Sequence, residues 1–380
     1  MNEPKKKRQH YVPRLLLRKF SKDDRTISLL VLSTGKQISG ASLKAQCYED
    51  YFYGADGALE NAFAQLEGKF SNILGDMAHE HLESLTQEQI QDARLFLHYQ
   101  RARTLGAAEE MNEFDETLIK QLISKDSRFS DMDLNKFKIT RENAQHDALY
   151  HASTTVPLLE DLKVKFLISD KKIGFVTSDH PVITYNQFAE HHPKFRHYRG
   201  TTGLATKGLQ LFLPLSPRVC LVVYDPSAYT LGNEAKRTCG IGLRDIRLLN
   251  ALQMLHAHEC VYFVPEFTPK EELERLEQER ARYGGWRKTK VFEGEMEERP
   301  DDMLSQLVVF SKPEVRIGAQ FGFMQVIDRS AYASYNLPDV PVRSQKMVDL
   351  TRQYGEFLDK MVEERAQAKK KHDKPGGDSE

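Results

Sequence analysis

The segment VKFLISDKKIGFVTSDHPVITYN, residues 164–186, marks the point where the chain changes from helical to β character. Three short runs rich in β-branched and aromatic residues are separated here by Asp-Lys-Lys and Asp-His-Pro, a pattern typical of antiparallel strands joined by turns. Similar runs follow: LQLFLPL (209–215), VCLVVYD (219–225) and CVYFVP (260–265). We therefore expect a mainly antiparallel sheet over about 164–265, with a helix around 246–257 inside it.

The residues before this segment have a helical period. Leu59, Phe63, Leu66 and Phe70 recur at the spacing of one helix face, and this predicts a helix from 59 to 77. The sequence TQEQ at 86–89 forms a capping box, so a second helix should begin there and run toward residue 104. Together these patterns predict a helical layer over about 59–160.

Both ends of the chain differ from this central part. TISLLVLSTGKQIS (26–39) predicts two strands around a Thr-Gly-Lys turn, a small N-terminal β unit. Helices that precede strands favour an α+β class, with one domain over 1–265. A charged helix at 270–282 and the strand QLVVF predict a C-terminal helix-strand extension over 266–360, and the last residues, 361–380, should be disordered because they have almost no apolar content.

Composition excludes some classes of function. The 380 residues carry 54 basic and 55 acidic side chains, so no overall field attracts nucleic acid or an anionic membrane. No stretch has the length of a membrane span or a signal peptide, and we expect a soluble cytoplasmic protein. The four cysteines have no CxxC spacing and should be buried, reduced thiols; they are Cys47, Cys220, Cys239 and Cys260.

A local excess of positive charge lies at the start of the chain, where nine basic residues face three acidic ones within residues 3–25. One interpretation is an arm that binds the phosphates of nucleic acid, and the other is a solvated basic terminus.

The strand end at residues 177–181 carries the first candidate site. Pro181 breaks the strand, so Ser178, Asp179 and His180 should lie at a kink at the sheet edge. There Asp179 could bind a metal ion or act as a general base. The alternative is structural, because an Asp before a turn commonly accepts backbone N–H bonds.

The helix from residue 86 carries the second candidate. Its apolar face, marked by Ala93 and Leu97, continues to Gln100 and Arg101, so the face becomes polar near the C-terminal end. A guanidinium group there needs a partner. That partner is either a core carboxylate or an anionic ligand held in a cleft.

The third candidate is the sequence LHAHECVYF (255–263), where His256, His258 and Glu259 lie at a change from helix to strand and could contribute ligands for a divalent cation. The pairs at 79–81 and 191–192 are less well placed. No Walker loop, GxGxxG, GxSxG or HExxH motif occurs, which argues against the most recognisable nucleotide, hydrolase and zincin classes.

Several motifs in order resemble the uncharacterised bacterial family called domain of unknown function 4238. They are RQHYVPRLLLRKFS, EDYFYG, HYQRART, FVTSDHPV, LPLSP with VCLVVYD, and LNALQMLHAHECVYF, and the resemblance covers roughly residues 7–264. His180 departs from the small amide residue expected there. The family has no established activity; the resemblance implies that its motif positions here are His10, Tyr11, Pro13, Phe20, Gln100, Arg101, Ser178, Asp179, Pro181 and Pro214.

These observations lead to two hypotheses about function. In both, the apolar residues of QHYVPRLLLRKF (9–20) dock the segment so that His10 lies against Asp179. The first is a phosphodiester-directed, nuclease-like hydrolase, acting in a defence or toxin context, with Mg²⁺ or Mn²⁺ as metal. The second is a non-catalytic binding or sensing module in which the His, Arg and Asp cluster is structural. The first assigns catalysis to His10, Asp179, Arg101 and Gln100, metal binding to Asp179, His258 and Glu259, and substrate contacts to Arg14, Tyr11 and Ser178.

Overall fold

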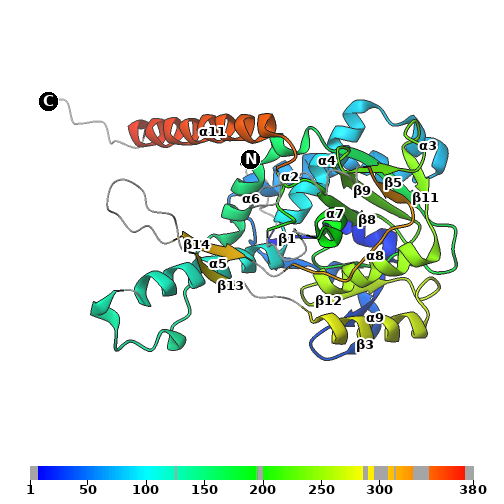
Figure 1. Cartoon of the computed structure of the whole chain (residues 1–380), viewed down its shortest axis with the longest axis horizontal. Helices are drawn as coiled ribbons and strands as arrows, with labels where there is room; N and C mark the ends of the chain where they lie inside the picture. The colour runs from blue at the N-terminus through cyan, green and yellow to red at the C-terminus, as the bar shows by residue number, and fades with distance from the viewer. Residues whose placement is uncertain are drawn as a thin grey trace.

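Two β-sheets organise the computed structural model, which describes residues 7–124, 126–193, 195, 200–285, 290–294, 307–311, 314–327 and 342–372 (Figure 1). The larger sheet has five strands in the order β11-β5-β9-β8-β7. All its pairs are antiparallel except β11 with β5. Its strands are β5 (Lys163–Ile168), β7 (Ile183–Tyr185), β8 (Gln210–Pro214), β9 (Val219–Tyr224) and β11 (Thr238–Gly240).

The second sheet has four strands in the order β3-β2-β12-β6. They are β2 (Thr26–Val31), β3 (Lys36–Ser42), β6 (Thr177–Ser178) and β12 (Cys260–Phe263). The hairpin predicted around residue 35 is confirmed, and Gly35 has the positive φ of 67° that its turn requires. The hairpin is not a separate N-terminal β unit, however. β2 has a buried centre and pairs with β12. The strands after residue 164 are divided between the two sheets.

The helical layer follows the predicted pattern closely. The two main predicted helices are confirmed as α2 (Ala58–Gly75) and α4 (Gln87–Ala102), and Thr86 forms the expected capping box with Gln89. The other helices are α1 (Arg14–Leu17), α3 (His79–Ser84), α5 (Leu105–Ser124), α6 (Ala144–Thr154), α7 (Gln187–His191), α8 (Leu243–His256), α9 (Lys270–Tyr283) and α11 (Gln345–His372), with 3-10 turns η1 (Arg18–Phe20), η2 (Leu43–Ala45), η3 (Ser127–Phe129), η4 (Leu134–Lys136) and η5 (Val156–Leu159). The α+β class is confirmed.

The five-stranded sheet separates two hydrophobic cores. Along β9, Leu221 packs with the helical layer and the N-terminal segment, whereas its neighbour Val222 packs with α7, α8 and residues 319–324. This division follows the alternation of side chains along a strand. A third core joins α8 and α9 to the four-stranded sheet, so α8 contributes to two cores.

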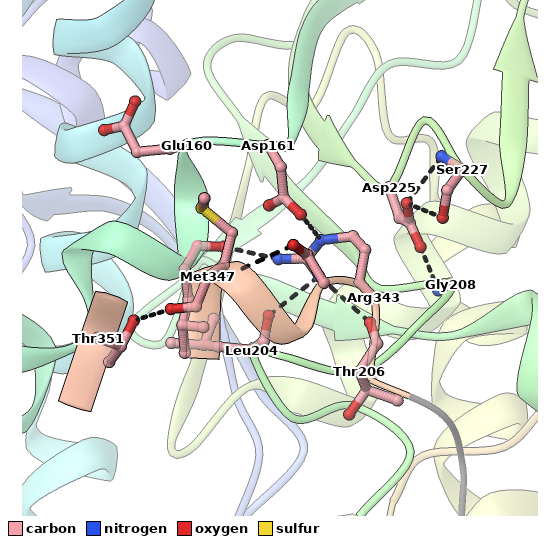
Figure 2. Close-up of polar contacts among 12 residues, drawn as sticks. Glu160, Asp161, Leu204, Thr206, Gly208, Asp225, Ser227, Arg343, Met347 and Thr351 are labelled. Atoms are coloured by element: carbon pink, nitrogen blue, oxygen red, sulfur yellow. Dashed lines mark hydrogen bonds and ion pairs between the residues drawn. The ribbon is translucent and has the colours of Figure 1, made fainter. Parts of the chain in front are cut away.

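The residues after 266 pack against the rest of the chain. β15 (Met324–Val326) pairs with β10 (Tyr229–Leu231), and β13 (Lys290–Gly294) pairs with β14 (Leu307–Ser311). Figure 2 shows the buried Arg343 side chain, which binds Asp161 at 2.9 Å and donates to the carbonyls of Leu158 at 2.6 Å and Leu204 at 3.1 Å. Arg343 thereby fixes the start of α11, which projects to one side in Figure 1.

α11 also changes the expectation for the end of the chain. It continues to His372, so the first part of the segment 361–380 is helical rather than disordered, and residues 373–380 lie outside the described ranges. The physical reason is composition, because Glu, Ala, Gln, Lys and Arg are strong helix formers even without an apolar face. No helix in the described part of the chain is long and apolar enough to cross a membrane. All four cysteines are free; Cys47 and Cys220 are buried and the other two are partly exposed.

Candidate functional site

The N-terminal motif segment, residues 9–20, is docked into the fold by its apolar residues. Val12, Leu16, Leu17 and Phe20 belong to the core between the helical layer and the five-stranded sheet. Strand β1 (Arg8–His10) overlaps the start of the segment. It pairs with β4 (Tyr48–Asp50), and this pairing holds that end of the segment. The segment is therefore held by both packing and backbone hydrogen bonds.

Polar side chains of α4 and the residues after it hold the backbone of this segment. Gln100 donates through Nε2 to the carbonyl of Tyr11 at 3.0 Å. Arg103 donates to the same carbonyl at 3.2 Å and to that of His10 at 3.3 Å. Arg103 also forms an ion pair with Glu67 at 2.7 Å, and its guanidinium lies over the ring of Phe63. Gln100 of α4 and Arg103 just after it therefore both anchor the backbone of this segment.

Sequence reasoning missed Arg103 and selected Arg101. Arg103 follows Gln100 by three residues, which places both on one helix face and was the available signal. Arg101 is only partly exposed, and burial lowers the pKa of its guanidinium while Glu110 opposes this shift. Its Nε has no hydrogen-bond partner among the described residues. No hydrogen bond or ion pair of the described chain joins Arg101 to His10 or Asp179.

Asp179 is a buried acceptor of backbone hydrogen bonds. Its carboxylate accepts the N–H groups of His258 at 3.0 Å, Glu259 at 2.7 Å and Cys260 at 3.1 Å. The structural role considered for Asp179, as an acceptor of backbone N–H bonds, is therefore observed. The donors are not in a local turn, however, but 79 to 81 residues further along the chain. Burial raises the pKa of Asp179 to about 6, against the lowering effect of these three hydrogen bonds. The carboxylate ties the turn between α8 and β12 to the end of β6.

The residues beside Asp179 form a second buried polar group. Ser178 accepts a hydrogen bond from Gln253 of α8 at 2.7 Å and from the backbone of His180 at 3.0 Å. The imidazole Nδ1 of His180 lies 2.6 Å from the hydroxyl of Thr104. Ser178 and His180 therefore connect the strand end to α8 and to the loop after α4, and Ser178 is fully buried.

The described contacts of His10 involve other residues than those of Asp179. Its ring is 5.8 Å from that of Tyr48, and the guanidinium of Arg8 lies 4.9 Å from the Tyr48 ring centre. Burial lowers the pKa of His10 to about 4, with further lowering by Arg14, Arg103 and Arg8. The imidazole is thus neutral at pH 7, and its buried Nε2 has no partner among the described residues.

The expected pairing of His10 with Asp179 does not occur, because all the hydrogen bonds of Asp179 go to residues 258–260. Within the motif segment, the charge of Asp179 acts on Tyr11. Burial is the main cause that raises the pKa of the Tyr11 hydroxyl, and Cys47 and then Asp179 raise it further. Tyr11 is itself buried, which leaves little of it for contact with a substrate.

The proposed metal ligands are neighbours, but they meet through backbone groups. Glu259 is exposed, and His258 contacts Glu109 of α5 through its Nε2. Both contribute backbone N–H groups, not side chains, to Asp179. Within the described ranges, no group of three or more His, Cys, Asp or Glu side chains could hold a metal ion. Both ring nitrogens of His256 lie within hydrogen-bond distance of a backbone carbonyl, Nδ1 at 2.8 Å from that of Leu252 and Nε2 at 3.1 Å from that of Thr184.

Comparison with known proteins gives one match. The family described as "Protein of unknown function (DUF4238)" matches residues 8–267, which is more than half of the chain. No curated protein and no solved structure matches the chain. The matched range includes the motif segment, α4, Asp179 and α8.

Proposed function

The chain belongs to the DUF4238 family of proteins of unknown function, and we propose that it is a binding module that holds nucleic acid on an N-terminal basic surface. This surface is defined by Arg8, His10, Arg14 and Tyr48. The observation that carries the proposal is the placement of two arginines without an ion pair to a described residue: the Arg8 guanidinium lies 4.9 Å from the Tyr48 ring centre, and Arg14 lies close enough to His10 for its charge to lower the His10 pKa.

The charge balance favours an anionic ligand at this surface. Arg103 is neutralised by Glu67, and the neighbouring Lys7 is paired with Asp50 at 3.1 Å. Arg8 and Arg14 form no ion pair with a described residue. Their uncompensated charge creates a positive potential that phosphate groups can neutralise, with release of counterions.

The same surface offers an aromatic group beside the cations. Tyr48 is half-buried, and its ring lies near both the His10 ring and the Arg8 guanidinium. Proteins that bind single-stranded nucleic acid combine aromatic rings, on which bases stack, with cations along the backbone path. Gln100 and Arg103 hold the backbone of this segment, so its side chains start from a fixed position.

The test is a binding titration with a labelled single-stranded oligonucleotide at several salt concentrations. We expect wild-type binding that weakens with salt, and at low salt an affinity at least about tenfold lower for the double variant Arg8→Gln/Arg14→Gln, with the salt slope reduced by roughly two. The matched control is Arg128→Gln/Arg352→Gln, which removes two exposed arginines elsewhere and should bind as wild type. Equal binding by both double variants, or none by the wild type at low salt, would refute the proposal.

A second candidate function is phosphodiester hydrolysis, and one observation favours it. His10 is neutral at pH 7, and its Nε2 lacks a partner among the described residues, so it is able to accept a proton as a general base. In this hypothesis Arg101 stabilises the developing phosphoryl charge and Mg²⁺ or Mn²⁺ assists the reaction, but Asp179 is left out of the metal site because its carboxylate already accepts three backbone N–H groups.

The two candidates are separated by a nuclease assay with either metal. Cleavage that is lost in His10→Ala and Arg101→Gln but kept in the arginine control variant supports hydrolysis. If cleavage survives in both His10→Ala and Arg101→Gln, or if the wild type cleaves nothing, hydrolysis by these residues is excluded. Binding without cleavage supports the binding module.

A further inference from the structure

An open groove of about 440 Å³ lies between α8 and α9, away from the N-terminal basic surface. Helix α8 belongs to the matched family range, whereas α9 and Ile317, which also line the groove, lie beyond it. The two helices lie side by side in Figure 1. The volume is within the range of sites for small ligands, roughly 300 to 1,000 Å³. The groove therefore exists only because residues after the matched range pack on the family domain.

Four arginines dominate the polar lining of this groove. Glu272 lies beneath them with a buried side chain, and it binds both Arg247, through Nε at 2.9 Å, and Arg275, through Nε at 3.0 Å. Arg275 also donates to the backbone carbonyl of Arg247 at 3.3 Å. A guanidinium group has five N–H donors, so both retain donors beyond these bonds. One buried carboxylate thus holds two arginines in fixed positions.

The charges of the other two arginines are not neutralised by an ion pair with a described residue. Arg244 and Arg282 are exposed, and neither forms an ion pair with a described residue. Glu279 is the only carboxylate among the described lining residues, and it lies 3.8 Å from Arg275. Four guanidinium groups therefore face two carboxylates, those of Glu272 and Glu279, which leaves an excess of two positive charges.

The N-terminal end of α8 adds to the attraction of the groove for anions. The groove is lined by the first two residues of the helix, Leu243 and Arg244, and the N-cap Gly242 provides no side-chain hydrogen bond. The N-terminus of a helix carries partial positive charge, which favours phosphate. The buried carboxylate of Asp245 in the first turn offsets part of this charge, so the arginines supply most of the attraction. The remaining lining is apolar or aromatic; it comprises Leu248, Ala251, Ile317 and Tyr283.

We propose that this groove binds a small phosphorylated ligand with an aromatic or apolar group, of the class of the nucleotides. The arginines and the start of α8 take the phosphates, and Tyr283 with the apolar lining takes the aromatic group. The site is separate from the N-terminal basic surface and does not depend on the function proposed for it.

The test is calorimetric titration of the full chain with ATP and, separately, with inorganic pyrophosphate. We expect saturable ATP binding tighter than about 1 mM, a Kd that corresponds to about 4 kcal/mol. Arg244→Gln and Arg282→Gln should each weaken the binding of both probes about tenfold, because each removes a charged hydrogen-bond donor. Arg352→Gln, an exposed arginine of α11, is the matched control and should change neither.

Tyr283→Ala distinguishes the two parts of the ligand. It should weaken ATP binding and leave pyrophosphate binding unchanged. Equal loss of both probes would overturn the aromatic assignment. No saturable binding of either probe at about 1 mM, or wild-type affinity in the Arg244→Gln/Arg282→Gln double variant, would overturn the site itself. Loss of binding in Arg8→Gln/Arg14→Gln instead would place the ligand on the N-terminal basic surface.

Discussion

Replacing Arg103 by Met tests how the N-terminal motif segment is held. The Arg103 side chain is only 1% exposed and joins Glu67 to the carbonyls of His10 and Tyr11. Loss of one partner of a buried ion pair costs about 3–5 kcal/mol. Since the Glu67 side chain is 24% exposed and can regain water, we expect the lower value, a decrease of about 3 kcal/mol in the free energy of unfolding.

The measurement is urea denaturation followed by circular dichroism, together with hydrogen exchange of residues 8–20. Met keeps an unbranched apolar side chain at this position and removes the guanidinium that lies over the Phe63 ring. The matched control is Arg101→Met, two residues earlier, where burial already disfavours the charge and Nε has no described partner. We expect that control to change the free energy of unfolding by less than about 1 kcal/mol.

The reasoning is refuted if the two variants have the same stability, or if the amides of residues 8–20 exchange as slowly in Arg103→Met as in the wild type. Either result would mean that apolar packing alone holds the segment. It would also remove the support that the fixed position of the N-terminal basic surface gives to nucleic-acid binding.

Three further variants test other parts of the structure. Arg343→Met should lower the free energy of unfolding by about 3 kcal/mol in urea and should speed protease cleavage in α11, because Asp161 and three carbonyls lose their buried donor; unchanged cleavage would argue against this anchor. Asp179 has a folded-state pKa of about 6 against an ordinary 3.8, so its stabilising contribution is complete below pH 3.8 and is lost as the pH rises through 6. The stability of wild type relative to Asp179→Asn should therefore fall by about 2 kcal/mol between pH 4 and pH 7, and a rise over that range would contradict the raised pKa. Thr86→Ala removes the capping box of α4 and should cost about 1 kcal/mol, measured by the same denaturation, whereas no loss would mean that tertiary packing alone fixes this helix start.

The sequence alone determined the local elements of this protein. The spacing of Leu59, Phe63 and Phe70 predicted α2, and the capping box at Thr86 predicted the start of α4. The β-branched runs after residue 164 predicted the strands and the α+β class. These features depend on residues within one or two turns of each other, so the periods of 3.6 and 2 are enough to reveal them.

Only the tertiary structure decided which distant groups meet. The sequence selected Arg101 because it continues an apolar face, whereas the segment backbone is bound by Arg103, whose role depends on Glu67 and on the docked carbonyls. Asp179 was correctly placed at a strand end, yet its partners are the amides of residues 258–260 and not His10. The pairing of β2 with β12 and the insertion of Arg343 also join distant segments. A buried polar group must be satisfied, but residue spacing does not specify its partner, because that choice depends on how sheets and helices pack around it.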